Sequence, residues 1–318
     1  MRKFWALLFG IVILGCFVLT AVSPWFGWWL PMNVASYGGE VDRLFYVILG
    51  VTAFFFVLTE GILVYNMFRF EAEPGKRAEF SHGHHRLEMI WTVIPGVLLF
   101  LLAVVQISVW ADIKYPSHLI DQFDAGKGED YLQMEVVTRQ WEFRMRYPSP
   151  DRLEGWKDKA KAKQDFENRL PAQRDDVYLV NDVHTWKGQK VIVYLKTRDV
   201  NHAFFVPSLR VKQDATSGRV IPLWFQATES NVMYDQGTNT WTGGWRMDAP
   251  GKFTLDKEYD WDLVCTHYCG SRHSLMRGKL YVHPTKEDFM AWLRDAQKNS
   301  LRTEPEKAAD NKVAAATN

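Results

Sequence analysis

The stretch CTHYCGSRHSLM, residues 265 to 276, holds two cysteines, two histidines and a methionine, although the whole chain of 318 residues contains only three cysteines. A disulfide between Cys265 and Cys269 is one interpretation of this segment, and a zinc site is another. Methionine is a poor zinc ligand, whereas thiolates, imidazoles and a thioether together are typical of a copper site. The residue types therefore favour copper.

The number of thiols in this segment also bears on how many metals it binds. A blue-copper site uses one cysteine, two histidines and a weak axial methionine, so the second thiolate exceeds what one copper needs. The simplest arrangement is two coppers bridged by Cys265 and Cys269, each completed by one histidine, with weaker axial donors. A second histidine must then come from elsewhere. His202 is the best candidate, because it ends the predicted strand that begins at Val191 and precedes a Phe-Phe-Val-Pro turn.

Short β-type runs must position these residues. Residues 132–137, 177–180, 191–195 and 223–227 are rich in β-branched and aromatic residues and are separated by turn signals. Several such strands at short spacing indicate a sandwich or a barrel.

Two segments interrupt the β pattern. Residues 149–176 are densely charged, and we expect a surface excursion with an amphipathic helix over residues 155–170. Residues 229–251 are glycine-rich and predict a long loop. After residue 283 we expect a short helix over residues 286–298, followed by a polar, disordered tail.

Three apolar stretches lie in the N-terminal third. Residues 4–22 follow a positive start and fit either a secretory signal or an uncleaved anchor; Cys16 lies in a sequence that resembles a lipoprotein box, so lipidation of Cys16 is a further alternative. Residues 44–68 and 89–109 are long enough to cross a bilayer as a helical hairpin. The loop over residues 69–86 is rich in basic residues, which places it in the cytoplasm and the domain after residue 113 outside.

Composition excludes some functions. The formal net charge is +1, so no global charge indicates nucleic acid as a partner. No Cys-x-x-Cys-His motif occurs, so the sequence predicts no fused c-type haem.

Four motifs resemble subunit II of haem-copper cytochrome c oxidases. Residues 265–276 fit that family's Cys-x3-Cys-x3-His-x2-Met loop at every ligand position. Residues 199–219 resemble the segment that carries the first histidine, residues 139–143 resemble the aromatic segment, and residues 87–95 resemble the start of the second hairpin helix. The motifs occur in the family's order.

The resemblance implies a fold and its boundaries. The fold is an N-terminal transmembrane α-helical hairpin joined to an all-β cupredoxin domain, a Greek-key sandwich. Residues 1–23 are a signal peptide or an extra transmembrane helix, and residues 42–113 are the hairpin. Residues 130–284 are the periplasmic copper domain, and residues 285–318 are the short helix and disordered tail.

The resemblance also implies a site and partners. The site is a binuclear CuA centre with two copper ions, whose ligands are His202, Cys265, the backbone carbonyl of His267, Cys269, His273 and Met276. Trp141 is where electrons arrive from cytochrome c or another c-type donor, and Glu88 is the entrance of a proton path. The partners are subunit I, which holds the haems that reduce oxygen with proton pumping, subunit III and the lipid bilayer. The location is a bacterial inner membrane, crossed more than once, with the copper domain on the periplasmic side.

Departures from the family pattern modify these expectations. His267 stands where the family has a glutamate that contributes to a magnesium site at subunit I, so magnesium is uncertain. The segment between Arg219 and Cys265 looks longer than in the family. Residues 117–284 hold 24 Lys plus Arg against 23 Asp plus Glu, and Arg144 and Arg146 follow Trp141. We therefore expect a weakly charged cytochrome c or a donor held in a fixed assembly, and little dependence of turnover on salt.

Alternative functions share parts of the pattern. A quinol oxidase subunit would lack the copper ligands, and a nitrous-oxide reductase copper domain would lack the hairpin. A CuA-bearing subunit of a nitric-oxide reductase would have both features and is one alternative. A membrane-anchored copper-binding carrier is the other, although it would need neither Trp141 nor residues 87–95.

Overall fold

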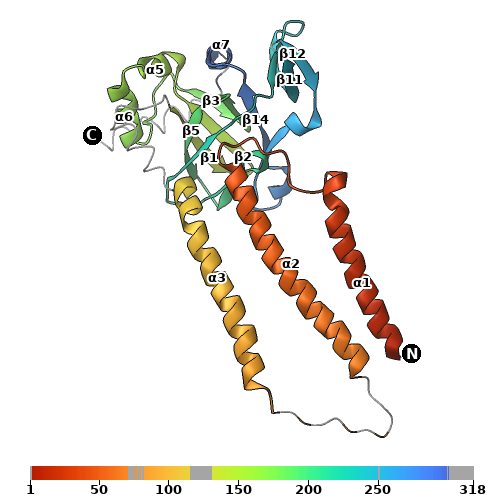
Figure 1. The fold of residues 1–318 in the computed structure, drawn as a ribbon. Helices are drawn as coiled ribbons and strands as arrows, with labels where there is room; N and C mark the ends of the chain where they lie inside the picture. The colour runs from red at the N-terminus through yellow and green to blue at the C-terminus, as the bar shows by residue number, and fades with distance from the viewer. Residues whose placement is uncertain are drawn as a thin grey trace. The chain divides into compact units, whose positions relative to one another are not determined.

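The structure, a computed structural model, describes residues 2–70, 75, 77, 80, 82–114, 131–249, 251–298 and 300. The chain divides into two compact units, one over residues 1–30 and 40–111 and the other over residues 31–39 and 112–318. Figure 1 shows the order of the elements, and each unit is described by itself.

The first unit is helical. It contains α1 (Arg2–Val22), the short 3-10 helix η1 (Ser23–Phe26), and most of α2 (Gly38–Arg69) and α3 (His85–Lys114). The three α-helices are long and apolar enough to cross a membrane, and α2 and α3 extend beyond the predicted runs at both ends. A helix satisfies its own backbone hydrogen bonds, which a lipid-facing segment requires. Large apolar side chains such as Phe54 and Phe100 are accordingly exposed along these helices.

The second unit is built on two five-stranded sheets. The first has the order β3-β2-β1-β5-β8, and the second has the order β4-β14-β13-β6-β7. The strands of the first sheet are β1 (Leu132–Arg139), β2 (Glu142–Tyr147), β3 (Val177–Val180), β5 (Lys190–Thr197) and β8 (Ile221–Gln226). Those of the second are β4 (Asp182–Trp186), β6 (His202–Val206), β7 (Val211–Ala215), β13 (Trp261–Val264) and β14 (Arg277–His283). All four predicted strands are present, and the cupredoxin-type sandwich is confirmed.

The core lies between the two sheets. Phe143 of β2 and Phe204 of β6 are fully buried, and their ring centroids are 6.3 Å apart in an edge-to-face contact. Most strand pairs are antiparallel, but β1 pairs with β5 and β14 pairs with β4 in parallel. Because β1 is central, both of its faces need a cover.

The charged insertion over residues 149–176 provides that cover. The amide of Gln133 on β1 donates to the carbonyl of Ala162 at 3.0 Å. The hydroxyl of Tyr194 on β5 donates to Gln133 at 3.1 Å and to the carbonyl of Phe166 at 3.2 Å. We expected residues 149–176 to lie on the surface. This expectation is wrong for the side of the insertion that packs on the sheet.

The insertion forms two short helices, α5 (Pro150–Gly155) and α6 (Lys159–Glu167), where one helix was expected over residues 155–170. The side chain of Ser149 accepts a hydrogen bond from the backbone N–H of Arg152 and caps α5. The side chain of Asp158 accepts from the N–H of Ala160 and caps α6. A capping aspartate starts a new helix, which explains the break.

The predicted long loop over residues 229–251 instead contains two hairpins. They are formed by β9 (Val232–Asp235) with β10 (Thr240–Gly243), and by β11 (Trp245–Ala249) with β12 (Lys252–Leu255). Tyr234 and Trp241 face each other across the first hairpin with ring centroids 4.9 Å apart. Such cross-strand aromatic pairs stabilise a hairpin even where glycines are frequent.

The predicted C-terminal helix is confirmed as α7 (Lys286–Lys298). Its Trp292 stacks on His184 of β4 with ring centroids 3.7 Å apart, and Phe289 packs beside Tyr147 of β2. Residues 301–318, predicted to be a disordered tail, lie outside the described residues.

Candidate metal centre

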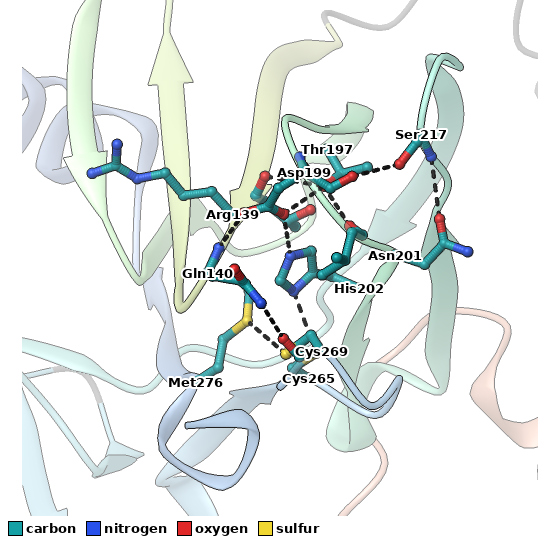
Figure 2. A network of polar contacts seen from close by, with 12 residues as sticks. Arg139, Gln140, Thr197, Asp199, Asn201, His202, Ser217, Cys265, Cys269 and Met276 are labelled. Carbon is teal, nitrogen blue, oxygen red and sulfur yellow. Dashed lines mark hydrogen bonds and ion pairs between the residues drawn. The ribbon is translucent and has the colours of Figure 1, made fainter. Parts of the chain in front are cut away.

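His202 is held at the start of β6 with its side chain fully buried. Its Nε2 lies 2.8 Å from Oδ1 of Asp199, and its Nδ1 lies 3.9 Å from Sγ of Cys265 (Figure 2). The contact with Asp199 favours the tautomer that carries its proton on Nε2, because a carboxylate accepts that proton. The lone pair of Nδ1 is then directed toward the cysteine sulfur.

The loop over residues 265–276 connects β13 to β14. These strands are antiparallel neighbours, with Val264 opposite Arg277, and the backbone N–H of Cys265 donates to the carbonyl of Met276 at 3.2 Å. Within the loop, residues 273–275 form the 3-10 helix η4. The strand pair thus closes the loop at its base and brings its first and last residues together.

The sulfur atoms of the loop converge. Sγ of Cys265 and Sγ of Cys269 are 3.9 Å apart, and Sδ of Met276 lies 4.0 Å from the second of these. A disulfide requires about 2.05 Å, and both cysteines are free thiols in the structure. The disulfide interpretation is therefore not what the structure adopts.

Nitrogen and oxygen donors complete the cluster. Nδ1 of His273 lies 3.4 Å from Sγ of Cys269, and the carbonyl oxygen of His267 lies 3.3 Å from Sγ of Cys265. The donor atoms of His202, Cys265 and Cys269 all lie within 4.8 Å of one another, in a buried position. All six residues predicted as copper ligands are thus brought together, while their roles as ligands stay predictions.

The two thiols differ in acidity. Burial raises the pKa of Cys265, but its polar contacts with the ring of His202 and with the backbone outweigh burial and bring this pKa to about 6. Burial raises the pKa of Cys269 to about 12, and the charge of the Cys265 thiolate adds to the effect. Without a cation only one sulfur ionises at neutral pH. A bound metal cation would deprotonate both, so the donor set fits a soft, positively charged occupant.

A surrounding shell of hydrogen bonds was not anticipated from the sequence. Asp199 accepts from the backbone N–H of Gln140 at 2.7 Å through the oxygen that His202 does not use. The side-chain amide of Gln140 donates to the carbonyl of Cys269 at 2.8 Å. Two features of the sequence could have indicated this network. Asp199 lies three residues before His202, and Gln140 directly precedes Trp141.

Trp141 lies in the turn between β1 and β2, against the copper loop. A Cβ atom added to Gly270 would lie 3.3 Å from Cζ2 and 3.4 Å from Nε1 of the indole, so only glycine fits without a shift. The guanidinium of Arg272 lies 5.9 Å from the ring centroid. The half-buried indole therefore reaches from the surface to the segment between Cys269 and His273.

The remaining predicted residues lie in the first unit. Glu88 is in the first turn of α3 and is exposed, and Cys16 is exposed on α1. Neither belongs to the metal cluster. The proton-path role of Glu88 and the lipidation of Cys16 remain predictions.

Two family models match the chain, and together they cover more than half of it. The transmembrane domain of cytochrome c oxidase subunit II matches residues 23–109, and the periplasmic domain of the same subunit matches residues 132–244. The chain belongs to the cytochrome c oxidase subunit II family. It is thus a membrane-anchored subunit of an oxidoreductase complex with a periplasmic domain, and the family implies copper. The second match ends before the loop over residues 265–276.

Relatives of this subunit are similar over most of its length. The alternative cytochrome c oxidase subunit 2 of Bradyrhizobium diazoefficiens is 26% identical over 294 residues, which cover 91% of this chain and 90% of that protein. Cytochrome c oxidase subunit 2 of Synechocystis sp. is 23% identical over 317 residues, which cover 87% of this chain and 79% of that protein. The periplasmic domain of subunit II of cytochrome oxidase from Bradyrhizobium japonicum is 17% identical, with a TM-score of 0.36, and covers 54% of this chain and 97% of that chain.

Proposed function

We propose that this chain is the electron-input subunit of a haem-copper cytochrome c oxidase. It accepts electrons from a c-type cytochrome and passes them to the haems of subunit I, where oxygen is reduced. The observation that carries the proposal is the pair of cysteine sulfurs 3.9 Å apart, Cys265 and Cys269, each facing the Nδ1 atom of a histidine.

The proposed copper ligands divide into strong and weak donors. Cys265, Cys269, His202 and His273 would be the strong donors that hold two copper ions. Met276 and the carbonyl of His267 would be the weak donors. When bound, such a pair supplies a one-electron store whose charge is shared by both metals.

The surrounding residues hold the ligands still. Asp199 orients the ring of His202, and the side chain of Gln140 holds the backbone of Cys269. Because the backbone of Gln140 also donates to Asp199, both halves of the site are linked to the turn that contains Gln140. The nearly complete burial of Cys269 and Met276 excludes water from the sulfur atoms. A site that changes little between redox states needs little reorganisation, which favours fast electron transfer.

Two further features of the complex belong to the proposal. The location is the inner membrane of a bacterium, with subunits I and III as neighbours and Glu88 at the entrance of a proton path. A magnesium site at the interface with subunit I would lack the side-chain oxygen of position 267, because an imidazole is a poor ligand for a hard cation.

Rapid mixing of the purified oxidase with a reduced c-type cytochrome tests the electron-input role. We expect the cytochrome to be oxidised in a fast phase that Trp141→Phe slows without a loss of copper. Trp245→Phe alters a half-buried tryptophan on β11 and serves as the matched control. Equal rates for both variants would contradict the role of Trp141, and a failure of every c-type cytochrome to be oxidised would contradict the function.

A further inference from the structure

A recess in the second unit lies apart from the metal cluster. It has a volume of about 550 Å³ and is formed between the β9–β10 hairpin and α7. β14 begins directly after Met276 and ends at His283, whose ring contacts Trp241 of the hairpin and Trp292 of α7. A strand of seven residues spans about 20 Å, so the recess lies at the end of β14 that is remote from the copper loop.

Three aromatic rings line the recess. Tyr234 and Trp241 belong to the hairpin, and Trp292 belongs to α7. The ring of His283, which is fully buried, lies 4.9 Å from that of Trp241 and 5.5 Å from that of Trp292 between centroids, and Trp292 also stacks on His184. Both tryptophans are therefore held in place by the core of the domain. Because the face of an aromatic ring carries partial negative charge, such a lining attracts cations.

Two carboxylates lie on the wall that α7 contributes. Asp288 and Asp295 line the recess together with Trp292, because positions three and four apart share one face of a helix. Oδ2 of Asp288 accepts a hydrogen bond from the hydroxyl of Thr285 at 2.7 Å. Asp295 contacts Lys298 at 3.3 Å, but the two side chains are 68% and 75% exposed, so this pair is weak.

The charge of the recess is negative. Among the described residues that line it there is no lysine, arginine or histidine. Asp288 and Asp295 are seven positions apart on α7, about 10 Å along the helix axis, whereas the ligands of one metal ion all lie about 2–3 Å from it. The two carboxylates are therefore too far apart to chelate one metal ion, but they can pair with the two ends of an elongated cation.

We propose that the recess binds a free organic amine with two ammonium groups, an alkyl diamine in its protonated form. The ammonium groups would pair with Asp288 and Asp295, and the alkyl chain would lie across Trp292 and Trp241. The recess also has the size of a small-molecule site, about 300–1,000 Å³. The proposal goes beyond the electron-input role and does not depend on it, since the recess shares no residue with the metal cluster. One of its walls, α7, also follows residue 244, where the match to the family's periplasmic domain ends.

Isothermal titration calorimetry of the intact oxidase with octamethylenediamine tests the proposal. We expect saturable binding of one diamine per chain, and roughly tenfold weaker binding of ethylenediamine, which is too short to reach both carboxylates. Sodium chloride at the same ionic strength should give no saturable signal. No binding of the long diamine, or equal binding of both diamines, would overturn the proposal.

The same titration of the purified chain shows whether the recess is open in the complex. We expect octamethylenediamine to bind the purified chain and the intact oxidase with similar affinity. Binding to the chain that is absent from the oxidase would mean that a neighbouring subunit covers the recess or fills it with a lysine side chain. That result would overturn the assignment of the recess to a free amine.

Two variants of α7 locate the binding site. Asp295→Asn removes one carboxylate of the recess at an exposed position, and should weaken the binding of octamethylenediamine roughly tenfold. Glu287→Gln removes the same charge from the same helix at an exposed position that does not line the recess, and should bind the diamine like the wild type. Urea unfolding and the copper content show that both variants are folded. Equal weakening in the two variants, or unchanged binding in Asp295→Asn, would overturn the assignment to the recess.

Discussion

Nδ1 of His202 lies 3.9 Å from Sγ of Cys265, although the two residues are 63 positions apart in the chain. The contact exists because β6, which begins at His202, and β13, which ends just before Cys265, are antiparallel neighbours, with Val264 opposite Phe205. The sheet therefore assembles the site from two distant segments.

Removing the support of His202 should weaken metal binding. We expect Asp199→Ala to lower copper affinity by about ten- to a hundredfold, because the imidazole loses the carboxylate that orients it. A competition titration against a copper chelator measures this change. Asp214→Ala, which alters an exposed aspartate on β7, should bind copper like the wild type. An unchanged affinity for Asp199→Ala would show that Asp199 does not position the ligand.

Gly270→Ala should displace Trp141. Gly270 has φ +120°, which disfavours side chains, and a Cβ there would lie 3.0 Å from the amide nitrogen of Gln140. We expect a loss of about 1–3 kcal/mol in the free energy of unfolding and slower oxidation of the cytochrome. Gly155→Ala is the matched control, because nothing lies within 4 Å of its Cβ position. Similar rates in both variants would argue against contact between Trp141 and the loop.

The buried pair of His184 and His283 should make the domain less stable in acid. Their nearest ring nitrogens are 3.2 Å apart, and burial lowers the pKa of both, that of His283 to about 3. Because the unfolded histidines titrate near 6.5, the stabilising effect is fully present above that pH. It falls by up to about 2 kcal/mol per histidine between pH 6.5 and 5.

Urea titrations of the full chain at several pH values measure this dependence. His184→Phe keeps a ring stacked on Trp292 but removes one titrating group, so the slope of stability with pH should decrease. A slope equal to that of the wild type would contradict the assignment to this pair.

Arg146→Met should be strongly destabilising. It would remove the cation that the buried carboxylates of Asp176 and Glu135 share, although Asp176 keeps Arg152 at 3.2 Å and Glu135 keeps Lys196 at 2.7 Å. We therefore expect a loss of about 3 kcal/mol, at the low end of the cost of breaking a buried ion pair. Arg294→Met breaks a pair with Glu154 in which both side chains are about half exposed, and should change stability very little. Urea unfolding measures the stability of both variants. An equal loss in both would show that the buried network stabilises the domain no more than an exposed ion pair does.

The copper loop could be predicted from sequence because its ligands fall within one contiguous segment whose spacing carries the information. His202 was also identified, but the reason given for it is wrong: the strand that begins near Val191 ends at Thr197, and His202 begins β6 in the other sheet. The supporting pair of Asp199 and Gln140 could not be predicted, because only tertiary contacts between three loops give these common residues their partners.

Two elements of the fold were wrongly anticipated for related reasons. Glycines between residues 229 and 251 predict a loop, but cross-strand pairing of Tyr234 with Trp241 forms a hairpin. The charge density of residues 149–176 predicts a solvated surface, yet Arg146 and Arg152 pair with its acidic side chains inside the domain. Local composition does not report such long-range partners.

The EPR spectrum of the purified chain, with its copper content measured, tests the two-copper assignment most directly. We predict about two coppers per chain and a seven-line pattern, because one unpaired electron is shared equally by two copper nuclei. Cys269→Ser should abolish this pattern, and Cys16→Ser should preserve it, since Cys16 lies in the other unit. A wild-type chain with one copper and a four-line pattern, or with zinc, would contradict the assignment.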